Sequence, residues 1–388
     1  MTWGMLLVGA VTLAASLILT RVLRSLALRR GWYDQPGDPR RIHTVPTPRI
    51  GGVAMYLAFM IGLTLTLVPG VMPERLSPDS PPFGPPELWR VGLLALGATI
   101  ITAVMFVDDL RGLRPIPKLL WQLFVAGLVM LPDPRYLYLT PAHNIPGVPN
   151  GMLTGVVASF IQNPFGDEKH RQIQLLLPLA ILLTFFWIVG MMNAVNFMDG
   201  LDGLAGGVTV VACAVLFAVS LFSLGQTTIA FLPLILGAAA LGFLRYNFHP
   251  AQIFMGDSGS MFLGFALGVI SIIGGAKIAT ALLVLAVPIM DVAYVIIFRL
   301  LRGHSPLRAD RGHLHHRLFD LGWGQRLIAV VFYGVCGTVG GGLAFLPPGQ
   351  GLIKLGVLVL IAVLLGALLM VISRRQFDRA RNEAGRDA

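Results

Sequence analysis

The chain has 388 residues, of which 55% are hydrophobic and only 12% are charged, and its mean hydropathy is +0.77. Soluble domains carry about a quarter charged residues, so the composition excludes an ordinary soluble globular protein. The formal net charge of +10 raises the question of a nucleic-acid partner, and the answer depends on where the positive residues lie.

Apolar blocks near the ~20 residues that a bilayer-crossing helix needs recur along the chain. They predict an all-α integral membrane protein with eleven transmembrane helices, of which the fourth is the shortest. We treat residues 1–388 as a single polytopic domain with a basic tail at 373–388. The predicted spans are Trp3–Leu23, Gly51–Val68, Val91–Val107, Leu119–Leu131, Leu175–Met192, Ala205–Leu224, Thr228–Leu244, Ser260–Gly275, Ala279–Leu300, Leu327–Leu346 and Leu352–Ile372.

Positive residues gather on one side of this predicted topology. No charged residue precedes the first span and several arginines follow it, which predicts an external N-terminus and a cytoplasmic C-terminus. On this threading 22 of the 29 Lys and Arg residues are cytoplasmic. Membrane topology therefore explains the net charge, and no nucleic-acid partner is expected. Acidic residues and a histidine cluster lie on the same side, which predicts an active site formed by cytoplasmic loops.

The pair Asp108-Asp109 directly follows an apolar run. Two like charges ~4 Å apart repel by about 4 kcal/mol at an effective dielectric of 20, so a divalent cation would stabilise the pair. The alternative is a solvated helix end paired with Arg111 or Arg114.

Four polar side chains then follow at intervals of three: Asn193, Asn196, Asp199 and Asp202. Residues three apart share a helical face, so we expect these groups to project together toward a ligand. Helix capping explains one such residue but not four in register.

Asp257 lies in Gly-Asp-Ser-Gly-Ser at the start of a span. Metal binding and helix capping are the two candidate roles of Asp257. The Gly-Asp-Ser-Gly sequence also occurs in chymotrypsin-like proteases, but that interpretation fails because no β-barrel pattern surrounds the motif. We expect the upstream Asn247 and Phe254 to line the same pocket.

The last cytoplasmic loop carries His313, His315, His316 and Arg317. No cysteine accompanies the histidines, and the nearby acids are hard ligands that suit Mg²⁺ or Mn²⁺ better than zinc. We expect this cluster to bind a phosphate-rich ligand, and the alternative is a solvated basic loop.

Asp291 lies deep in the ninth span, where a charge costs ~2.5–3.5 kcal/mol. We therefore expect it to support the neighbouring loops, and the alternative is a role in ion transport.

The first cytoplasmic loop contains Arg41, His43 and Arg49, followed by Gly51-Gly52. These basic groups are candidates for holding anionic head groups, and the two glycines permit close backbone approach. The positive-inside bias explains any single arginine here equally well.

Together these motifs resemble the polyprenyl-phosphate N-acetylhexosamine-1-phosphate transferases of the WecA/TagO type, which are relatives of the MraY translocases. The resemblance extends from about residue 31 to about residue 320. His-Leu-His-His resembles the sugar-transferring branch, whereas MraY enzymes usually show an uninterrupted His triplet. Where a further Asp often follows the first pair, this chain has Gly112. The motifs are Pro-Arg-Ile-Gly-Gly (48–52), Asp108-Asp109, Asn-Ala-Val-Asn-Phe-Met-Asp-Gly-Leu-Asp-Gly-Leu (193–204), Phe-Met-Gly-Asp-Ser-Gly-Ser (254–260) and Asp-Arg-Gly-His-Leu-His-His-Arg-Leu (310–318).

The resemblance implies an enzyme of the bacterial cytoplasmic (inner) membrane that takes part in cell-envelope polysaccharide synthesis. It would transfer N-acetylhexosamine-1-phosphate, with GlcNAc-1-phosphate favoured, from a UDP-sugar to undecaprenyl phosphate and release UMP. The implied cofactor is Mg²⁺, with Mn²⁺ as the alternative, held by Asp257 together with Asp108 and Asp109. The implied partners are UDP-N-acetylhexosamine, the polyprenyl phosphate and membrane lipids, and a homodimer is left open.

The roles expected of the site residues follow the same motifs. Direct attack by the lipid phosphate and a covalent aspartyl-phosphate route both remain open. The alternatives are MraY-like transfer of phospho-MurNAc-pentapeptide, a membrane transporter, and a noncatalytic lipid-binding scaffold. The expected catalytic residues are Asp108, Asp109, Asp199, Asp202, His315 and His316, and the expected substrate-binding residues are Arg49, Asn193, Asn196, Asn247, Phe254, His313 and Arg317.

Overall fold

A computed structural model describes most of the chain. The described residues are 2–34, 46–72, 85–133, 156–157, 160–162, 172–273, 278–301 and 313–345, with short pieces between 353 and 367. The predicted tail at 373–388 lies outside the described residues, as do Arg41 and His43.

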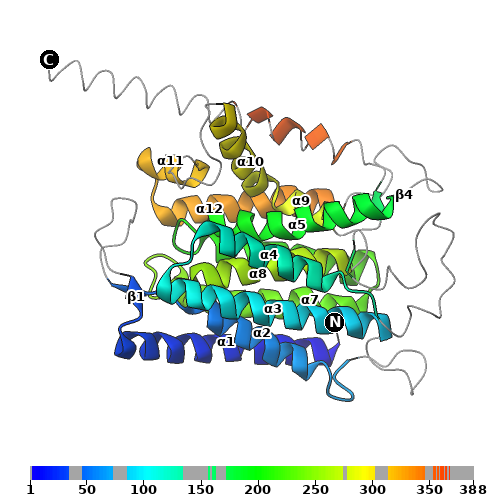
Figure 1. The fold of residues 1–388 in the computed structure, drawn as a ribbon, viewed down its shortest axis with the longest axis horizontal. Helices are drawn as coiled ribbons and strands as arrows, with labels where there is room; N and C mark the ends of the chain where they lie inside the picture. Colours follow the sequence, from blue (N-terminus) through cyan, green and yellow to red (C-terminus); the bar gives the residue numbers. More distant parts are fainter. Residues whose placement is uncertain are drawn as a thin grey trace.

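Long helices lie side by side and form a single bundle, from which α10 leans outward (Figure 1). Two π-helices, η1 (Val219–Ser223) and η2 (Cys336–Gly341), continue α6 and α12. The helices are α1 (Trp3–Arg30), α2 (Gly51–Leu65), α3 (Pro85–Arg111), α4 (Pro115–Val129), α5 (Leu177–Met198), α6 (Leu204–Ala218), α7 (Thr227–Asn247), α8 (Gly256–Ile273), α9 (Ile278–Val284), α10 (Ala286–Leu301), α11 (Leu314–Asp320), α12 (Gln325–Val335) and α13 (Gly342–Ala344).

Seven helical segments in the described part of the chain are long and apolar enough to cross a membrane, and three apolar helices are shorter. The protein is therefore a multi-pass membrane protein, as the composition predicts. The first eight predicted spans and the tenth each coincide with one of these segments. The short fourth span corresponds to the 15-residue α4, which extends only ~22 Å at 1.5 Å per residue.

The ninth and eleventh predicted spans differ from the rest. The ninth is divided at Leu285 into α9 and α10. Pro288 in the first turn of α10 has no N–H to donate to the carbonyl of Val284, where α9 ends. The eleventh lies mostly outside the described residues.

The centre of the bundle is α8, whose apolar window is 94% buried. It packs against α3 on one side and α5 on the other. From α5, the indole N–H of Trp187 donates to the Gly268 carbonyl at 3.2 Å and to Ser271 Oγ at 2.9 Å. Because α8 is fixed on several sides, its first turn is a rigid platform for side chains.

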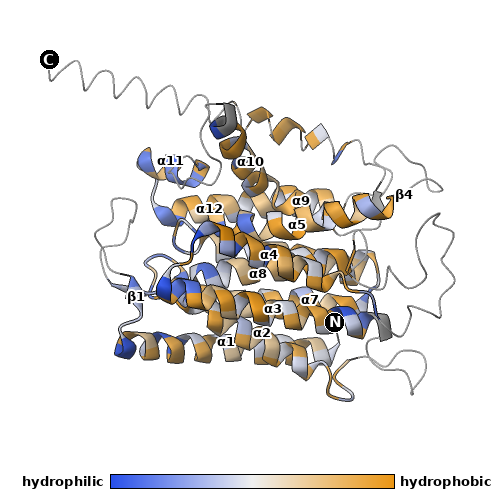
Figure 2. Ribbon diagram, viewed as in Figure 1, coloured by the Kyte–Doolittle hydropathy of each residue, from blue (hydrophilic) through white to orange (hydrophobic). Residues whose placement is uncertain are grey.

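Hydrophilic residues gather at the end of the bundle where β1 and α11 lie (Figure 2). We call this the site end; α1 begins at the opposite end (Figure 1). Here β1 (Tyr33–Asp34) pairs antiparallel with β2 (Thr47–Pro48). A second antiparallel pair, β3 (Phe160–Gln162) with β4 (Gln172–Gln174), lies in the segment between α4 and α5.

The segment after β2 is held against the start of α8 by backbone hydrogen bonds. Phe254 N donates to Pro48 O at 2.7 Å, Gly51 N to Phe254 O at 2.9 Å, and Gly52 N to Met255 O at 2.9 Å. A Cβ atom at Gly52 would lie 2.1 Å from Gly259 N, so only glycine allows this contact. The expected close approach at Gly51-Gly52 is thus confirmed, and it brings Arg49 to α8.

Candidate active site

Three carboxylates, from two helices that are far apart in the sequence, meet at the site end. Asp108 and Asp109 lie in the last turn of α3 and Asp257 lies in the first turn of α8, and one oxygen from each lies within 4.8 Å of the others. The ammonium group of Lys118, in the first turn of α4, lies 2.5 Å from Asp108 Oδ2 and 2.7 Å from Asp257 Oδ2. A single positive charge therefore bridges two carboxylates that would otherwise repel each other.

Asp109 has a different environment from its neighbour. Its side chain is 0% exposed, and its two oxygens accept hydrogen bonds from Asp257 N at 2.8 Å and Ser258 N at 3.0 Å. These are backbone donors of the first turn of α8, which lack a partner within the helix. Asp109 therefore caps α8 from another helix and sets the position of Asp257.

Arg49 and Asn196 complete the surroundings of Asp257. Arg49 Nη2 lies 3.1 Å from Asp257 Oδ1, and its Nε lies 3.7 Å from Asp109 Oδ1. The Asn196 amide donates to Asp257 Oδ1 at 3.5 Å and to Ser260 Oγ at 2.8 Å. The first loop, α5 and α8 thus contribute polar groups around one carboxylate.

The four polar groups spaced by three do not project together, and this expectation is wrong for Asp202. Asn193 and Asn196 lie in α5, which ends at Met198, and Asp199 is its C-cap. Asn193 donates to Gln122 Oε1 at 2.7 Å. Asp202 lies in the turn beyond the helix, where its Oδ2 is 2.7 Å from His249 Nδ1 and accepts from Ala251 N at 3.0 Å. The shared face is lost because the helix stops before Asp202.

Asp199 remains electrostatically linked to the carboxylate cluster. Burial raises the pKa of its carboxyl group well above the ordinary value of 3.8. The positive charge of Arg49 opposes this shift, whereas the negative charges of Asp257 and Asp109 increase it. Asp199 is therefore a candidate for holding a proton near the site, or for losing it when a positive charge binds.

Asn247 and Phe254 join the loops of the site through their hydrogen bonds. Asn247 is 2% exposed; its Oδ1 accepts from Gly203 N at 3.1 Å and its Nδ2 donates to Ile253 O at 3.0 Å. Phe254 contributes the backbone bonds to the segment after β2. In this structure Asn247 positions two loops, because both ends of its amide are used by the backbone.

The histidine cluster lies against the turn that follows α5. The ring of His313 stacks on Phe197 at 5.4 Å and on His315 at 5.7 Å, and His315 is 4.3 Å from His316. A Cβ atom at Gly200 would lie 2.4 Å from His315 Nε2. The histidines and the 193–204 motif therefore meet in the structure, with Gly200 leaving room for the rings.

Charge within this cluster is limited by burial. His315 is 2% exposed, and burial lowers the pKa of its imidazole well below 6.5, with His316 and His313 adding repulsion. Its Nε2 is buried and has no hydrogen-bond partner among the described residues. Arg317 is also buried, 5.9 Å from the centre of the Tyr294 ring.

Asp291 supports the histidine cluster. It is 4% exposed; its Oδ2 lies 3.1 Å from His313 Nδ1 and its Oδ1 accepts from Leu314 N at 2.8 Å. It therefore orients one histidine and caps the first turn of α11. This is the supporting role that the sequence predicts for the one carboxylate deep in an apolar span.

Sequence reasoning missed Lys118, Gln122 and His249. Lys118 follows Asp108 by ten positions at the start of an apolar helix, and the positive-inside bias explains such a lysine without any further role. Gln122 is four residues later on α4, so an (i, i+4) polar pair on an otherwise apolar helix was the available signal. Nothing in the sequence connects His249 with Asp202.

The donor set fits a hard divalent cation. Mg²⁺ is commonly held by one or two carboxylates plus substrate phosphates, and Asp108 and Asp257 each direct an oxygen at the same ammonium group. Asp109 belongs to the same group of acids, although backbone N–H groups already use both of its oxygens.

Comparison with known proteins identifies the family. The model of glycosyl transferase family 4 matches residues 91–275. The chain is 34% identical over 329 residues to the "probable undecaprenyl-phosphate N-acetylglucosaminyl 1-phosphate transferase" of Bacillus subtilis (strain 168), covering 83% of this chain and 79% of the relative. This chain belongs to glycosyl transferase family 4. The resemblance to polyprenyl-phosphate N-acetylhexosamine-1-phosphate transferases that its motifs predict is confirmed.

Two further relatives of this family 4 chain show the breadth of the similarity. The "decaprenyl-phosphate N-acetylglucosaminephosphotransferase" of Mycolicibacterium smegmatis (strain ATCC 700084 / mc(2)155) is 31% identical over 97% of this chain and 90% of its own length. The "phospho-N-acetylmuramoyl-pentapeptide-transferase" of Staphylococcus aureus (strain JH9) is 30% identical over 63% of this chain and 78% of its own length. The matched residues 91–275 include all three carboxylates but neither Arg49 nor the histidine cluster at 313–316.

Proposed function

We propose that this family 4 enzyme transfers N-acetylglucosamine-1-phosphate from UDP-GlcNAc to undecaprenyl phosphate and releases UMP. The observation that carries the proposal is the convergence of Asp108 and Asp257 on one positive charge, at the polar end of a membrane bundle. A lipid phosphate and a nucleotide diphosphate repel each other, so their reaction needs cationic groups close to the membrane surface. The names of the B. subtilis and M. smegmatis relatives support this choice of donor group and acceptor.

We assign Asp108 and Asp257 as the carboxylates that hold Mg²⁺, with Mn²⁺ as the alternative, and Asp109 as the residue that positions Asp257. When bound, the metal ion supplies positive charge against the donor diphosphate and favours departure of UMP. Arg49 lies 3.1 Å from Asp257 and is 41% exposed, so the same guanidinium group reaches both the carboxylate cluster and an incoming phosphate.

The chemistry assigned to the chain's own residues is a direct transfer. An oxygen of the lipid phosphate attacks the phosphorus atom that bears the sugar, a new P–O bond forms, and the bond from that phosphorus to UMP breaks. Asp108 orients the attacking oxygen and accepts its proton where it carries one. When both substrates are bound, Lys118 lies near their phosphates. Its positive charge stabilises the negative charge that develops on the oxygen of the departing UMP. Asn196 and Asp199 align the diphosphate from the end of α5.

The histidine cluster is assigned to the sugar and the diphosphate. The rings of His313, His315 and His316 lie against Gly200, directly after Asp199, so a ligand aligned by Asp199 extends toward them. Arg317 contributes a positive charge from the same short helix. Asn247, Phe254 and Asp202 are assigned to the nucleoside side, where they hold the loops that enclose it.

The proposed setting is the bacterial inner membrane, with eleven spans, an external N-terminus and the site end in the cytoplasm. It is supported by the charge distribution, since UDP-sugars are cytoplasmic and 22 of the 29 Lys and Arg residues lie on that side of the predicted topology. A homodimer is compatible with this arrangement.

The test is an assay with purified protein, polyprenyl phosphate and a panel of UDP-sugars, in which UMP release is measured with and without EDTA. We expect release with UDP-GlcNAc, loss of release with EDTA, and loss in Asp257→Asn while the protein stays folded. Near-normal turnover of Asp257→Asn would refute the metal assignment. Rapid-quench trapping of a phosphorylated enzyme without lipid would overturn direct attack.

A second candidate function is transfer of phospho-MurNAc-pentapeptide. The observation that favours it is the 30% identity to the S. aureus relative over 259 residues. The interrupted His-Leu-His-His at 313–316 favours the first candidate, and UDP-MurNAc-pentapeptide is therefore included in the panel as the deciding donor.

A further inference from the structure

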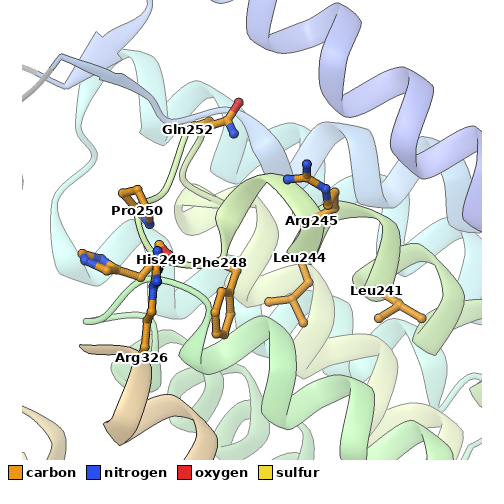
Figure 3. A pocket seen from close by; sticks show the side chains of 8 residues that line it. All are labelled: Leu241, Leu244, Arg245, Phe248, His249, Pro250, Gln252 and Arg326. Carbon is orange, nitrogen blue, oxygen red and sulfur yellow. Dashed lines mark hydrogen bonds between the residues drawn. The ribbon is translucent and has the colours of Figure 1, made fainter. Parts of the chain in front are cut away.

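A separate pocket opens at the site end between α7 and α12, beside the turn that carries Asp202 (Figure 3). Its volume is about 520 Å³, which is large enough for a lipid headgroup. None of the three clustered carboxylates lines it. The pocket is therefore distinct from the proposed catalytic centre.

The walls of this pocket are divided by chemical character. Leu241 and Leu244 of α7 and the following Phe248 form an apolar side, and Leu241 is 46% exposed on a helix long and apolar enough to cross the membrane. Arg245 and Arg326 supply two positive charges, one from α7 and one from α12 (Figure 3). An apolar wall that faces lipid, next to two guanidinium groups, matches a molecule with an acyl chain and an anionic head.

The two arginines are not neutralised by the described part of the protein. Within the described part of the chain, no carboxylate forms an ion pair with Arg245 or Arg326, and the hydrogen bond of Arg326 runs from its Nε to His249 O at 2.9 Å. Asp202, in the adjoining turn, is already in contact with His249 and accepts from Ala251 N. The pocket therefore carries a net positive charge that favours an anion.

The pocket is joined to the site motif through short polar contacts. His249 lines the pocket and its Nδ1 donates to Asp202 Oδ2 at 2.7 Å. On the other side, Gln325 Oε1 accepts from Asp202 N at 3.2 Å, next to Arg326. A ligand that orders Arg326 and His249 would therefore hold the turn that begins at Asp199.

We propose that this pocket binds the phosphate of an anionic phospholipid, with Arg245 and Arg326 on the headgroup and Leu241, Leu244 and Phe248 against the first part of an acyl chain. Binding holds the 199–203 turn through His249 and Asp202, so the lipid acts as an activator and not as a substrate. The effect on turnover rests on the proposed function, whereas lipid binding does not.

The binding test uses the full chain in detergent, titrated with phosphatidylglycerol and followed by native mass spectrometry, with zwitterionic phosphatidylcholine, which has no net charge, as the comparison. An arginine near an anionic headgroup contributes about a fivefold gain in affinity, so Arg245→Gln/Arg326→Gln should weaken phosphatidylglycerol binding about thirtyfold. The matched control is Arg29→Gln/Arg111→Gln, which removes two exposed arginines elsewhere and should change binding by less than about threefold.

Each arm of the test decides the identity of the ligand. Equal binding of phosphatidylglycerol by the wild type and the double variant overturns the proposal, as does equal binding of phosphatidylcholine. If inorganic phosphate alone binds to the pocket as tightly as phosphatidylglycerol does, the proposed contact with the acyl chain is wrong. If polyprenyl phosphate displaces the phospholipid stoichiometrically, the pocket is a substrate site. Arg245→Gln alone is the second variant, because the Arg245 side chain makes no hydrogen bond or ion pair with a described residue whose loss would impair folding.

The activating effect of the bound phospholipid is tested by measuring turnover. In phosphatidylcholine nanodiscs, added phosphatidylglycerol should raise UMP release by the wild type several-fold and leave the double variant unchanged. A wild type that binds the lipid but shows equal turnover with and without it refutes the activating role. A wild type that binds the lipid and releases no UMP from any donor contradicts the proposed function, while the lipid site still stands on the binding data.

Discussion

Lys118 Nζ lies 2.7 Å from Asp257 Oδ2, although the two residues are 139 positions apart in the chain. The same nitrogen contacts Asp108. The ammonium group therefore occupies the position between the two carboxylates where a divalent cation would bind. Metal binding and the lysine contact therefore compete for the same oxygens.

This competition predicts the effect of Lys118→Gln on metal affinity. Without the ammonium group, we expect Mn²⁺ to bind at least about tenfold more tightly in the absence of substrate, which corresponds to about 1.4 kcal/mol. Turnover should fall, because a positive charge near the phosphates is lost. Mn²⁺ binding is measured by electron paramagnetic resonance. The control is Arg114→Gln, an exposed arginine just before α4; equal affinity in both variants would contradict the competition.

Asp109→Asn should act through the position of α8. An amide retains one acceptor oxygen for the two backbone donors Asp257 N and Ser258 N, so we expect a loss of about 1–3 kcal/mol in stability. Thermal unfolding in detergent checks this. Asp257→Asn is the comparison, since it removes a buried charge and leaves the cap intact. A melting temperature for Asp109→Asn at or above that of Asp257→Asn would refute the capping role.

Gly52→Ala tests the contact between α2 and α8. The added Cβ would lie 2.1 Å from Gly259 N and 2.4 Å from Gly259 Cα, and because both are backbone atoms the helices must separate, at a cost of about 1–3 kcal/mol. We expect a lower melting temperature and weaker turnover. Gly92→Ala on α3 is the matched control, since its Cβ meets nothing within 4 Å and alanine favours a helix by about 0.5–1 kcal/mol.

The buried His315 predicts an acid-dependent loss of stability. Its pKa in the folded protein lies well below 6.5, so below that pH the unfolded chain binds a proton that the folded protein does not. The free energy of unfolding is therefore undiminished by this group above pH 6.5. Below that pH it falls as the pH decreases, by up to about 1.4 kcal/mol per pH unit from this group. Thermal unfolding of wild type and His315→Asn from pH 5 to 8 measures it. Parallel curves for the two proteins would show that His315 contributes nothing.

Much of the fold follows from the sequence because a bilayer imposes a simple requirement on it. Every span must satisfy its own backbone hydrogen bonds, so length and hydropathy locate the helical segment Leu204–Ser223 and α7 closely. The ninth span could not be located as well, because a proline near Leu285 interrupts the helix while the segment as a whole remains apolar.

The site was predictable to the level of its motifs and not of its contacts. Asp108, Asp257 and the histidines were identified because polar groups beside apolar spans need a physical reason. The separate roles of Asp108 and Asp109 were not, since adjacent residues on a helix point in different directions and only the position of α8 distinguishes them. The spacing of three also placed Asp202 on the wrong side, because α5 ends at Met198.

The sequence by itself determined that this is a multi-pass membrane protein with its polar chemistry at one end, because hydropathy and charge act on each segment locally. Only the tertiary structure decided that Lys118 joins two carboxylates, that Asp109 caps α8 and that His249 holds Asp202. Those contacts depend on how helices far apart in the chain pack, and packing geometry is a property of all the helices together.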